Sequence, residues 1–316
     1  MQMTVKNYYK RVFAFFILSV FLAACSYDSP SKRDTPTQGI EKIIIDESYY
    51  NFMSSELFTF MSKYPDALML EKFMPEEEAI QYLINDSVDV IVISRDLTTE
   101  EKEVFESKKI KARTVEIAKD AITFIVNRNN PDSIFTKKQM DLILSGKIKS
   151  WNELNNQRSN SNFVLVLDNE KSANARYLKD TFIKSTNFPS TITVAGNNLN
   201  VFKVVSENPN AIGIISNGWI SDRDDSTCNA LLNMISLVAI KKDEQSKAFQ
   251  PFQGYISSNE YPYTRKLYMI NTEGSNGLAT GFVSYVAGEK GQLIILKNGI
   301  VPAIVPSRSV KIDIEH

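Results

Sequence analysis

From about residue 40, strand-like and helix-like segments alternate along the chain. Short apolar runs at residues 41–46, 67–73 and 88–94 predict three strands. A helix-like segment follows each run, and the last of these starts with Thr98 and Glu101 in the spacing of a capping box. Repeated units of this kind predict a mostly parallel sheet that collects ligand-binding groups at the carboxyl ends of its strands.

The stretch from residue 114 to 154 is predicted to connect the two halves of the fold. Its first half is apolar and β-branched up to an Asn/Pro turn at residues 127–131, which predicts a buried strand. Its second half predicts a short amphipathic helix with Thr136 at the N-cap and Gly146 where the helix ends. We expect this stretch to be the crossing between two α/β lobes, with a ligand cleft beside it.

The remaining segments divide between the two expected lobes. Lobe one is expected to be discontinuous, with residues 40–126 plus 261–316, and lobe two to span residues 127–260. The pattern within lobe two predicts strands at 163–167 and 235–240, helices at 173–183 and 201–207, and surface loops at 155–162 and 221–229. The polar tail, residues 307–316, is expected to be an edge strand or a loose end.

The N-terminal residues 1–24 are predicted to be a targeting segment and not part of the fold. Three basic residues precede an apolar run at 12–24, which is shorter than the roughly 20 residues that span a bilayer. The run ends in Leu-Ala-Ala-Cys25, which resembles a bacterial lipoprotein box. The resemblance implies that Cys25 is the lipid attachment site, that residues 25–39 are a tether, and that the protein is anchored in the cell envelope, on the periplasmic or the outer face of a bacterial membrane. An ordinary cleaved secretory peptide is the alternative.

Composition limits the classes of protein that remain. Without residues 1–24, which carry three Lys/Arg and no acid, the formal charge changes from -1 to -4 and 292 of the 316 residues are left. A mildly acidic chain without a basic run argues against nucleic acid as a partner. Beyond Cys25 the sequence has only Cys228, so the fold does not depend on an internal disulfide. We expect Cys228 to be an unpaired, partly buried small residue.

Nothing in the sequence indicates catalysis. The one histidine is His316, the last residue, which leaves no internal histidine for a Ser/His/Asp triad, a Cys/His dyad or a histidine-based zinc site. The chain also has no phosphate-binding Gly-x-x-x-x-Gly-Lys-Ser/Thr loop and no Gly-x-Gly-x-x-Gly motif after a strand. We therefore expect neither an enzyme nor a bound cofactor or metal.

An ordered set of short motifs resembles the phosphate-type (PstS-like) substrate-binding proteins of ABC importers. The motifs are Ser94-Arg95 after a buried strand, the run at 145–154, the Ala-Ile-Gly-Ile-Ile strand at 211–215, the Tyr-Pro-Tyr crossing at 261–263, and the terminal helix and strand at 291–302. The resemblance covers nearly all of residues 40–306. It implies a type II periplasmic-binding-protein fold, in which two α/β lobes close by a hinge over one small anion. It also implies an ABC permease partner, and we expect the binding protein itself to be a monomer.

The same resemblance implies the ligand-binding residues Ser48, Ser94, Arg95, Ser172 and Asn174. Backbone N–H groups, hydroxyls and an arginine suit a small anion. Two turns depart from the family pattern: residues 73–76 replace a Gly/Ser-rich turn and bring in Glu76, and Asp168 lies near the position of a family arginine. Simple N-caps are the alternative role for Ser48 and Ser172, and a salt bridge to Asp120 or Glu76 is the alternative for Arg95.

Two functions follow as hypotheses from different classes. The first is a lipid-anchored solute-binding protein that captures phosphate or another small anion for an ABC importer. The second is a cell-surface sensor or interaction module that keeps the fold but has lost phosphate binding. A cleft lined by hydrogen-bond donors favours the first, and a cleft filled by Phe73, Met74 or acidic side chains favours the second.

Overall fold

The computed structural model describes residues 34–154, 161–184, 187–274 and 276–305. The predicted signal segment, Cys25 and the polar tail at 307–316 lie outside the described residues, as does most of the predicted loop at 155–162. The described residues from Thr35 onward belong to one compact unit. Among the described helices, none has the length and apolar character needed to cross a membrane.

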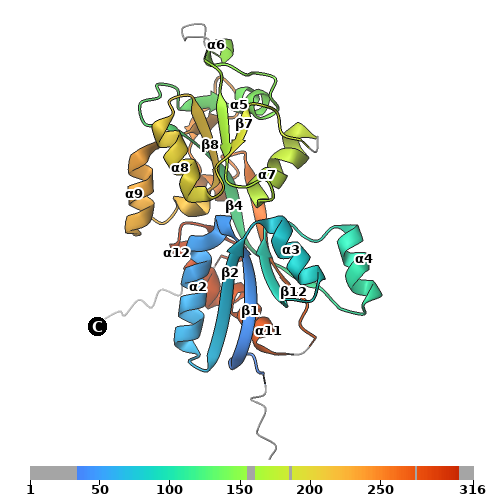
Figure 1. Cartoon of the computed structure of the whole chain (residues 1–316). Helices are drawn as coiled ribbons and strands as arrows, with labels where there is room; N and C mark the ends of the chain where they lie inside the picture. The colour runs from blue at the N-terminus through green and yellow to red at the C-terminus, as the bar shows by residue number, and fades with distance from the viewer. Residues whose placement is uncertain (1–33, 155–160, 185–186, 275, 306–316) are drawn as a thin grey trace, which may run out of the picture. The chain divides into compact units, whose positions relative to one another are not determined.

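One long mixed sheet runs through this unit (Figure 1). Its strand order is β2-β1-β3-β12-β4-β8-β6-β7, and two short strands, β9 and β13, pair with β4 at its sides. The strands are β1 (Gly39–Asp46), β2 (Ala67–Met74), β3 (Val90–Ile93), β4 (Arg113–Asn127), β6 (Val164–Leu167), β7 (Ile192–Val194), β8 (Ala211–Ser216), β9 (Ile235–Leu237), β12 (Thr264–Asn271) and β13 (Val301–Pro302). A second, three-stranded sheet contains β5 (Ile134–Thr136), β10 (Ala239–Lys241) and β11 (Ala248–Phe249).

Strand β4 belongs to both halves of the long sheet. Its residues 113–121 pair antiparallel with β12, and its residues 122–127 pair antiparallel with β8 and, near the end, with β9. This pairing agrees with a crossing in this segment, and its exact place stays a prediction. The helix expected after the crossing is also present as α5 (Lys137–Leu144), with Thr136 in a capping box and Gly146 at a φ of +70°.

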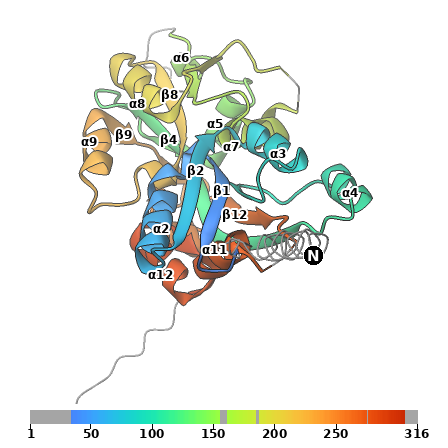
Figure 2. The ribbon, with the colours of Figure 1, turned by 60° about the horizontal axis from the view of Figure 1, so that its bottom comes forward.

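Helices cover both faces of the sheet in lobe one. The parallel strands β1, β2 and β3 alternate their side chains, so Ile43 and Ile45 pack on one face while Ile44 packs on the other. The first face is covered by α2 (Tyr50–Lys63), α11 (Leu278–Ala287) and α12 (Glu289–Lys297), which Figure 2 shows side by side. The second face is covered by α3 (Glu76–Ile84) and α4 (Thr99–Ser107).

Lobe two repeats this arrangement around the second half of β4. Phe124 and Val126 pack on one face against α5, α6 (Trp151–Leu154), α7 (Ala173–Leu178) and α10 (Gln253–Ser257). Ile125 packs on the other face against α8 (Asn198–Glu207) and α9 (Ser226–Met234). Trp151 is 1% exposed within the first of these cores.

Three of the predicted elements in lobe two differ from the structure. The single strand predicted at 235–240 is two strands, because β9 pairs with β4 whereas β10 pairs with β5 in the other sheet. The loop predicted at 221–229 contains the start of α9, where Asp225 accepts a hydrogen bond from the Cys228 backbone N at 2.7 Å. The predicted helix at 173–183 is α7 followed by a turn of π-helix, η3 (Lys179–Ile183). The polar residues that cap α9 look like loop residues in the sequence, which explains the wrong loop prediction. The apolar run at 235–240 is continuous although its two halves pair in different sheets, which explains the prediction of a single strand.

The exact division into lobes stays a prediction. The core residues of β4 change from one lobe's cluster to the other's between Ala118 and Ala121, and Tyr261 and Tyr263 pack in the lobe-two core. We propose, on this basis, that the crossings lie near residues 119–121 and 263–264, a few residues from the predicted boundaries.

Candidate functional site

A buried carboxylate, that of Asp46, lies where three helical segments begin. Strand β1 ends at Asp46, and its register places Asp46 beside Met74, two residues before α3. The Asp46 Oδ1 atom accepts a hydrogen bond from the Ser48 backbone N at 2.9 Å, in the 3-10 turn η2 (Glu47–Tyr49). Its Oδ2 atom accepts from the Glu76 backbone N at 2.8 Å, at the start of α3, and from the Ala173 backbone N at 3.2 Å, at the start of α7.

The backbone N–H groups of Ser48, Glu76 and Ala173 surround this carboxylate, and we call this arrangement the cradle. The first N–H groups of a helix have no partner within the helix and carry the positive end of its dipole, so they favour a negative charge. Helix α3 belongs to lobe one and α7 to lobe two, so the cradle is made by both lobes. In this structure the chain's own Asp46, which has no exposed surface, supplies the negative charge.

A second carboxylate, that of Glu76, occupies the neighbouring turn after β3. Its Oε2 atom accepts from the Ser94 backbone N at 2.7 Å and from the Ser94 Oγ at 2.8 Å. Its Oε1 atom pairs with the Arg176 guanidinium of α7 and lies 4.0 Å from the Nε of Arg95. Burial by itself would raise the pKa of Glu76, but Arg176 and the Ser94 hydrogen bonds hold that pKa below its ordinary value.

A third carboxylate, that of Asp168, lies on the lobe-two side. Its Oδ1 atom accepts from the Ser172 Oγ at 2.7 Å, and its Oδ2 atom accepts from the Nδ2 atoms of Asn174 and Asn198, each at 3.3 Å. Burial raises the pKa of Asp168 to about 6 against the opposing effect of the Ser172 hydrogen bond. The pKa of Asp46 is also raised to about 6, first by burial and then by repulsion from Glu76 and Asp168.

Direct hydrogen bonds join the two lobes around this cradle. The Glu77 backbone N donates to the Lys171 carbonyl at 3.1 Å, and the Arg176 Nη2 donates to the Ser94 Oγ at 2.7 Å. Together with the bond from Ala173 to Asp46, they hold the start of α3 against the start of α7. The structure therefore describes a conformation in which the lobes meet at the cradle.

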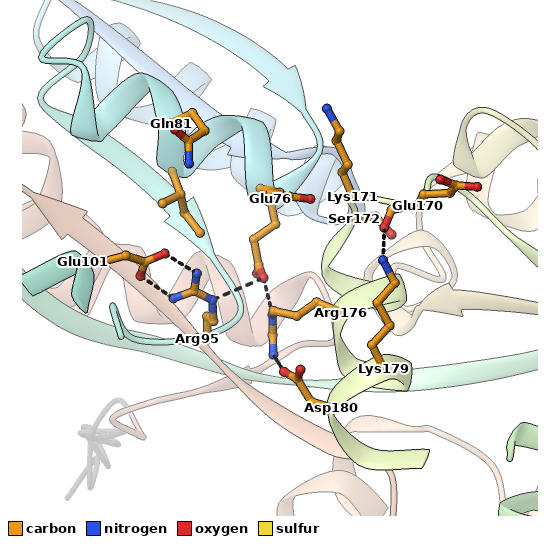
Figure 3. Close-up of a pocket in the computed structure, with 12 residues that line it drawn as sticks. Glu76, Gln81, Arg95, Glu101, Glu170, Lys171, Ser172, Arg176, Lys179 and Asp180 are labelled. Carbon is orange, nitrogen blue, oxygen red and sulfur yellow. Dashed lines mark hydrogen bonds and ion pairs between the residues drawn. The ribbon is translucent and has the colours of Figure 1, made fainter. Parts of the chain in front are cut away.

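A pocket of about 340 Å³ opens beside the cradle, between the two lobes (Figure 3). Four basic side chains line it, from Arg95, Lys171, Arg176 and Lys179, and acids lie among them. Arg95 makes a bidentate pair with Glu101 at 2.7 Å for both bonds, and Arg176 also reaches Asp180 at 2.9 Å. The positive charge of the pocket is thus largely balanced by its own carboxylates.

A buried ion pair joins β4 and β12. Asp120 on β4 faces Arg265 on β12 in the strand register, and the Asp120 Oδ2 accepts from the Arg265 Nη2 at 2.8 Å and from the Ser216 Oγ at 3.0 Å. The Arg265 guanidinium also lies 5.5 Å from the ring centre of Tyr49. Of the two salt bridges considered for Arg95, the one to Asp120 is wrong, because Asp120 pairs with Arg265. The one to Glu76 is present at 4.0 Å, beside the shorter pair of Arg95 with Glu101.

The predicted ligand residues are brought together, although their contact with a ligand stays a prediction. Four are buried, and each bonds to one of the three carboxylates: Ser48, Ser94, Ser172 and Asn174. Ser172 is also the N-cap of α7, so the simple capping role is observed. Arg95 lies at the rim of the pocket, with 21% of its side chain exposed.

Sequence reasoning missed Asp46, Arg176 and Arg265. Asp46 is the last residue of a predicted strand, and Arg176 is one helical turn after Ser172, so both had a signal in the sequence. Arg265 could be found only from the register of two antiparallel strands distant in the chain.

Two α/β lobes that share crossing strands, with helix N-termini from both directed at one buried point, define the type II periplasmic-binding-protein fold. A phosphate-bound structure of a proposed phosphate ABC transporter substrate-binding protein from Clostridium perfringens has this fold, with a TM-score of 0.70, 22% identity and coverage of 84% of this chain and 100% of that one. An ABC-type phosphate transport receptor from Vibrio cholerae is similar, with a TM-score of 0.62, 18% identity and coverage of 84% and 100%.

A family model described as a PBP superfamily domain matches residues 31–290, and the chain belongs to this superfamily. A curated relative is the phosphate-binding protein PstS of Staphylococcus aureus (strain USA300), which is 26% identical over 219 residues. That match covers 67% of this chain and 63% of the relative. The relatives' names describe binding and transport, not catalysis.

Proposed function

We propose that the protein is a solute-binding protein that captures phosphate or another small anion between its lobes for an ABC importer. The observation that carries this proposal is the cradle itself, in which the N-termini of α3 and α7, from different lobes, donate to one carboxylate. An anion that received these bonds would hold the lobes together and stabilise the closed conformation. The family and the PstS relative support the same role.

The negative charge of Asp46 opposes the binding of such a ligand. A dianion beside the carboxylates of Asp46 and Glu76 would meet strong like-charge repulsion in a buried site. The anion therefore has to displace Asp46 or bind when Asp46 is protonated. The pKa of about 6 for Asp46 makes protonation accessible in mildly acidic surroundings.

The surroundings of the protein are part of the same proposal. The order Leu-Ala-Ala-Cys25 supports a lipid anchor at Cys25, with the binding unit outside the cytoplasm and next to an ABC permease. We expect the protein to act there as a monomer that delivers its ligand to the permease.

A sensor or interaction module is the second candidate, and a specific observation favours it. Asp46 and Glu76 take the helix N-terminal and Ser94 bonds that an anion would receive, and the lobes are joined by the chain's own side chains. A module of this kind would be closed without a ligand. It would present a fixed surface to a protein partner.

Thermal unfolding of the full-length protein with phosphate, sulfate, small carboxylates and sugars separates these candidates. A ligand at about 100 times its dissociation constant adds roughly 2.7 kcal/mol to the unfolding free energy. We expect a shift with phosphate or another anion. No shift with any anion would reject the transport proposal in favour of the interaction module.

Ala173→Pro identifies the cradle as the binding site. Proline suits the first position of a helix, and Ser172 already has the extended conformation that a residue before proline prefers, with φ -73° and ψ 164°. The change removes one N–H group from the cradle, and we expect the affinity for the anion to fall about tenfold or more. Ala173→Gly keeps the N–H group and is the matched control. Equal affinities in the two variants would show that the anion binds elsewhere.

A further inference from the structure

A second and larger pocket, of about 710 Å³, lies between the lobes near the start of α2. Lobe one contributes Tyr50 and Phe73, and lobe two contributes Trp219 from the 3-10 turn η4 (Asn217–Trp219). Its size is typical of pockets that bind small organic molecules. It is distinct from the pocket beside the cradle, with which it shares no lining residue.

Three aromatic rings form one wall of this pocket. The rings of Tyr50 and Phe73 meet edge to face, with centroids 4.8 Å apart, and the rings of Tyr50 and Trp219 are nearly parallel, with centroids 6.0 Å apart. Trp219 is 5% exposed, whereas Tyr50 is 46% exposed. A large aromatic side chain that stays exposed inside a pocket leaves part of its π-surface available to a ligand.

The charged residues of the pocket are all acidic. Glu47, Asp222 and Asp225 line it, and among the described residues that line it none is lysine, arginine or histidine. Asp222 and Asp225 each use one carboxylate oxygen in a local hydrogen bond, to the backbone N of Asp224 at 3.0 Å and of Cys228 at 2.7 Å. A carboxylate has two acceptor oxygens, so these bonds do not exhaust either group.

The combination of aromatic faces and carboxylates determines the class of ligand. An anion would be repelled by three acids, and a neutral apolar molecule would leave the carboxylates without a counter-charge. An organic cation gains from both features, because a cationic nitrogen is attracted to aromatic faces and to carboxylates. We propose that this pocket binds a small organic ammonium ion, with its nitrogen near the exposed ring of Tyr50 and its charge balanced by Asp222 and Asp225.

This site is independent of the anion cradle. Its residues come from both lobes, so a bound cation would bridge the lobes at a different place from the cradle. The inference does not depend on whether phosphate binds. A chain that binds no anion at all can still bind the ammonium ion.

Tryptophan fluorescence and calorimetry with choline test this inference on the full chain. The sequence has two tryptophans, and Trp151→Phe leaves Trp219 as the only tryptophan whose fluorescence is excited selectively. We expect a saturable change in fluorescence with choline. We expect the neutral isostere 3,3-dimethylbutan-1-ol to bind about tenfold or more weakly, because it has the same shape without the charge.

Variants assign the binding to this pocket. Tyr50→Ala should weaken choline binding by about tenfold, Asp222→Asn several-fold, and Tyr50→Phe by less than about threefold, because phenylalanine keeps the aromatic face. Tyr255→Ala is the control, since Tyr255 is similarly exposed at 39% and lies outside the pocket. Circular dichroism and thermal unfolding check that each variant is folded. If Tyr50→Ala does not fold, Asp222→Asn and Tyr50→Phe still test the proposal.

Three results would overturn the proposal. One is the lack of saturable binding up to about 10 mM choline, which is weaker than a specific site requires. Another is equal affinity for choline and its neutral isostere. The last is an unchanged affinity in both Tyr50→Ala and Asp222→Asn.

Discussion

Asp46 accepts hydrogen bonds from the first N–H groups of two helices that belong to different lobes. In proteins that bind anions at helix N-termini, this position is available to a ligand. Here a side chain from the end of β1 takes it, and two further buried carboxylates lie nearby, those of Glu76 and Asp168. Asp46 thus takes the position that an anion would need at these two N-termini.

Asp46→Asn should raise the affinity for phosphate by about tenfold or more, because the change removes a negative charge from the cradle and keeps the size of the side chain. Calorimetry of phosphate binding at pH 7.5 measures the effect. Asp243→Asn, in an exposed turn of lobe two, is the control for a simple change in net charge. If Asp46→Asn binds phosphate no better than the control does, Asp46 is not what limits anion binding.

Among the secondary-structure elements, α8 depends on a glycine in the strand beneath it. A Cβ atom at Gly213 on β8 would lie 2.7 Å from the Ile125 Cγ1 and the Val205 Cγ2, which belong to β4 and α8. Side-chain atoms in a packed core do not move far without cost. The close approach of this helix to the sheet therefore requires glycine.

Gly213→Ala should lower the unfolding free energy by about 1–3 kcal/mol through overpacking. The matched control is Gly254→Ala in α10, where an added Cβ meets no atom within 4 Å and alanine favours the helix. Urea denaturation of both variants measures the difference. A Gly213→Ala protein as stable as the Gly254→Ala protein would mean that α8 can shift on the sheet.

Most elements were predicted from the sequence because their signals are local. The capping box of Thr98 and Glu101 begins α4 as expected, and apolar runs gave β1, β2 and β3. The errors occurred where partners distant in the chain decide the structure. No local pattern shows that residues 235–240 change sheets at Val238, whose backbone N donates to the Phe124 carbonyl.

For the molecule as a whole, the site shows the same difference between features with a local sequence signal and features that depend on distant partners. Motifs placed Ser48, Ser94, Ser172 and Asn174 at the same edge of the sheets, and the structure brings them together. The pairing of Glu76 with Arg176 joins residues on different lobes, and the sequence contains no information on how far the lobes close. The pairing of acidic and basic side chains inside the cleft therefore depends on how the two lobes meet in the folded chain.

Buried acids give the whole molecule a pH-dependent stability. The raised pKa values of Asp46 and Asp168, about 6 each against 3.8, mean that the folded chain keeps protons that the unfolded chain has lost. Their contribution to stability is complete below pH 3.8 and is lost as the pH rises to about 6. Glu56, whose carboxyl oxygens have no hydrogen-bond partner among the described residues, extends this loss to about pH 9, because burial raises its pKa to about 9.

We therefore expect the unfolding free energy to fall as the pH rises from 5 to 9, with a slope that approaches about 1.4 kcal/mol per pH unit for each titrating group. Urea denaturation across this range measures the slope. The double variant Asp46→Asn and Asp168→Asn should flatten the curve below about pH 6, and Glu56→Gln should flatten it above. The exposed Glu103→Gln should leave the curve unchanged. Stability that increases between pH 5 and 8 would contradict this assignment.

Because Asp46 is covalently part of the chain, it competes for the cradle as a permanently tethered ligand. A short flexible tether gives an effective concentration in the millimolar range, and Asp46, which the pairing of β1 with β2 holds in place, has at least that value. A free anion at micromolar concentration can replace it only if the vacant cradle prefers that anion about a thousandfold. In the proposed transport role, the carboxylate of Asp46 thus sets a threshold, so that the cleft responds to an abundant or strongly preferred anion and not to a scarce one.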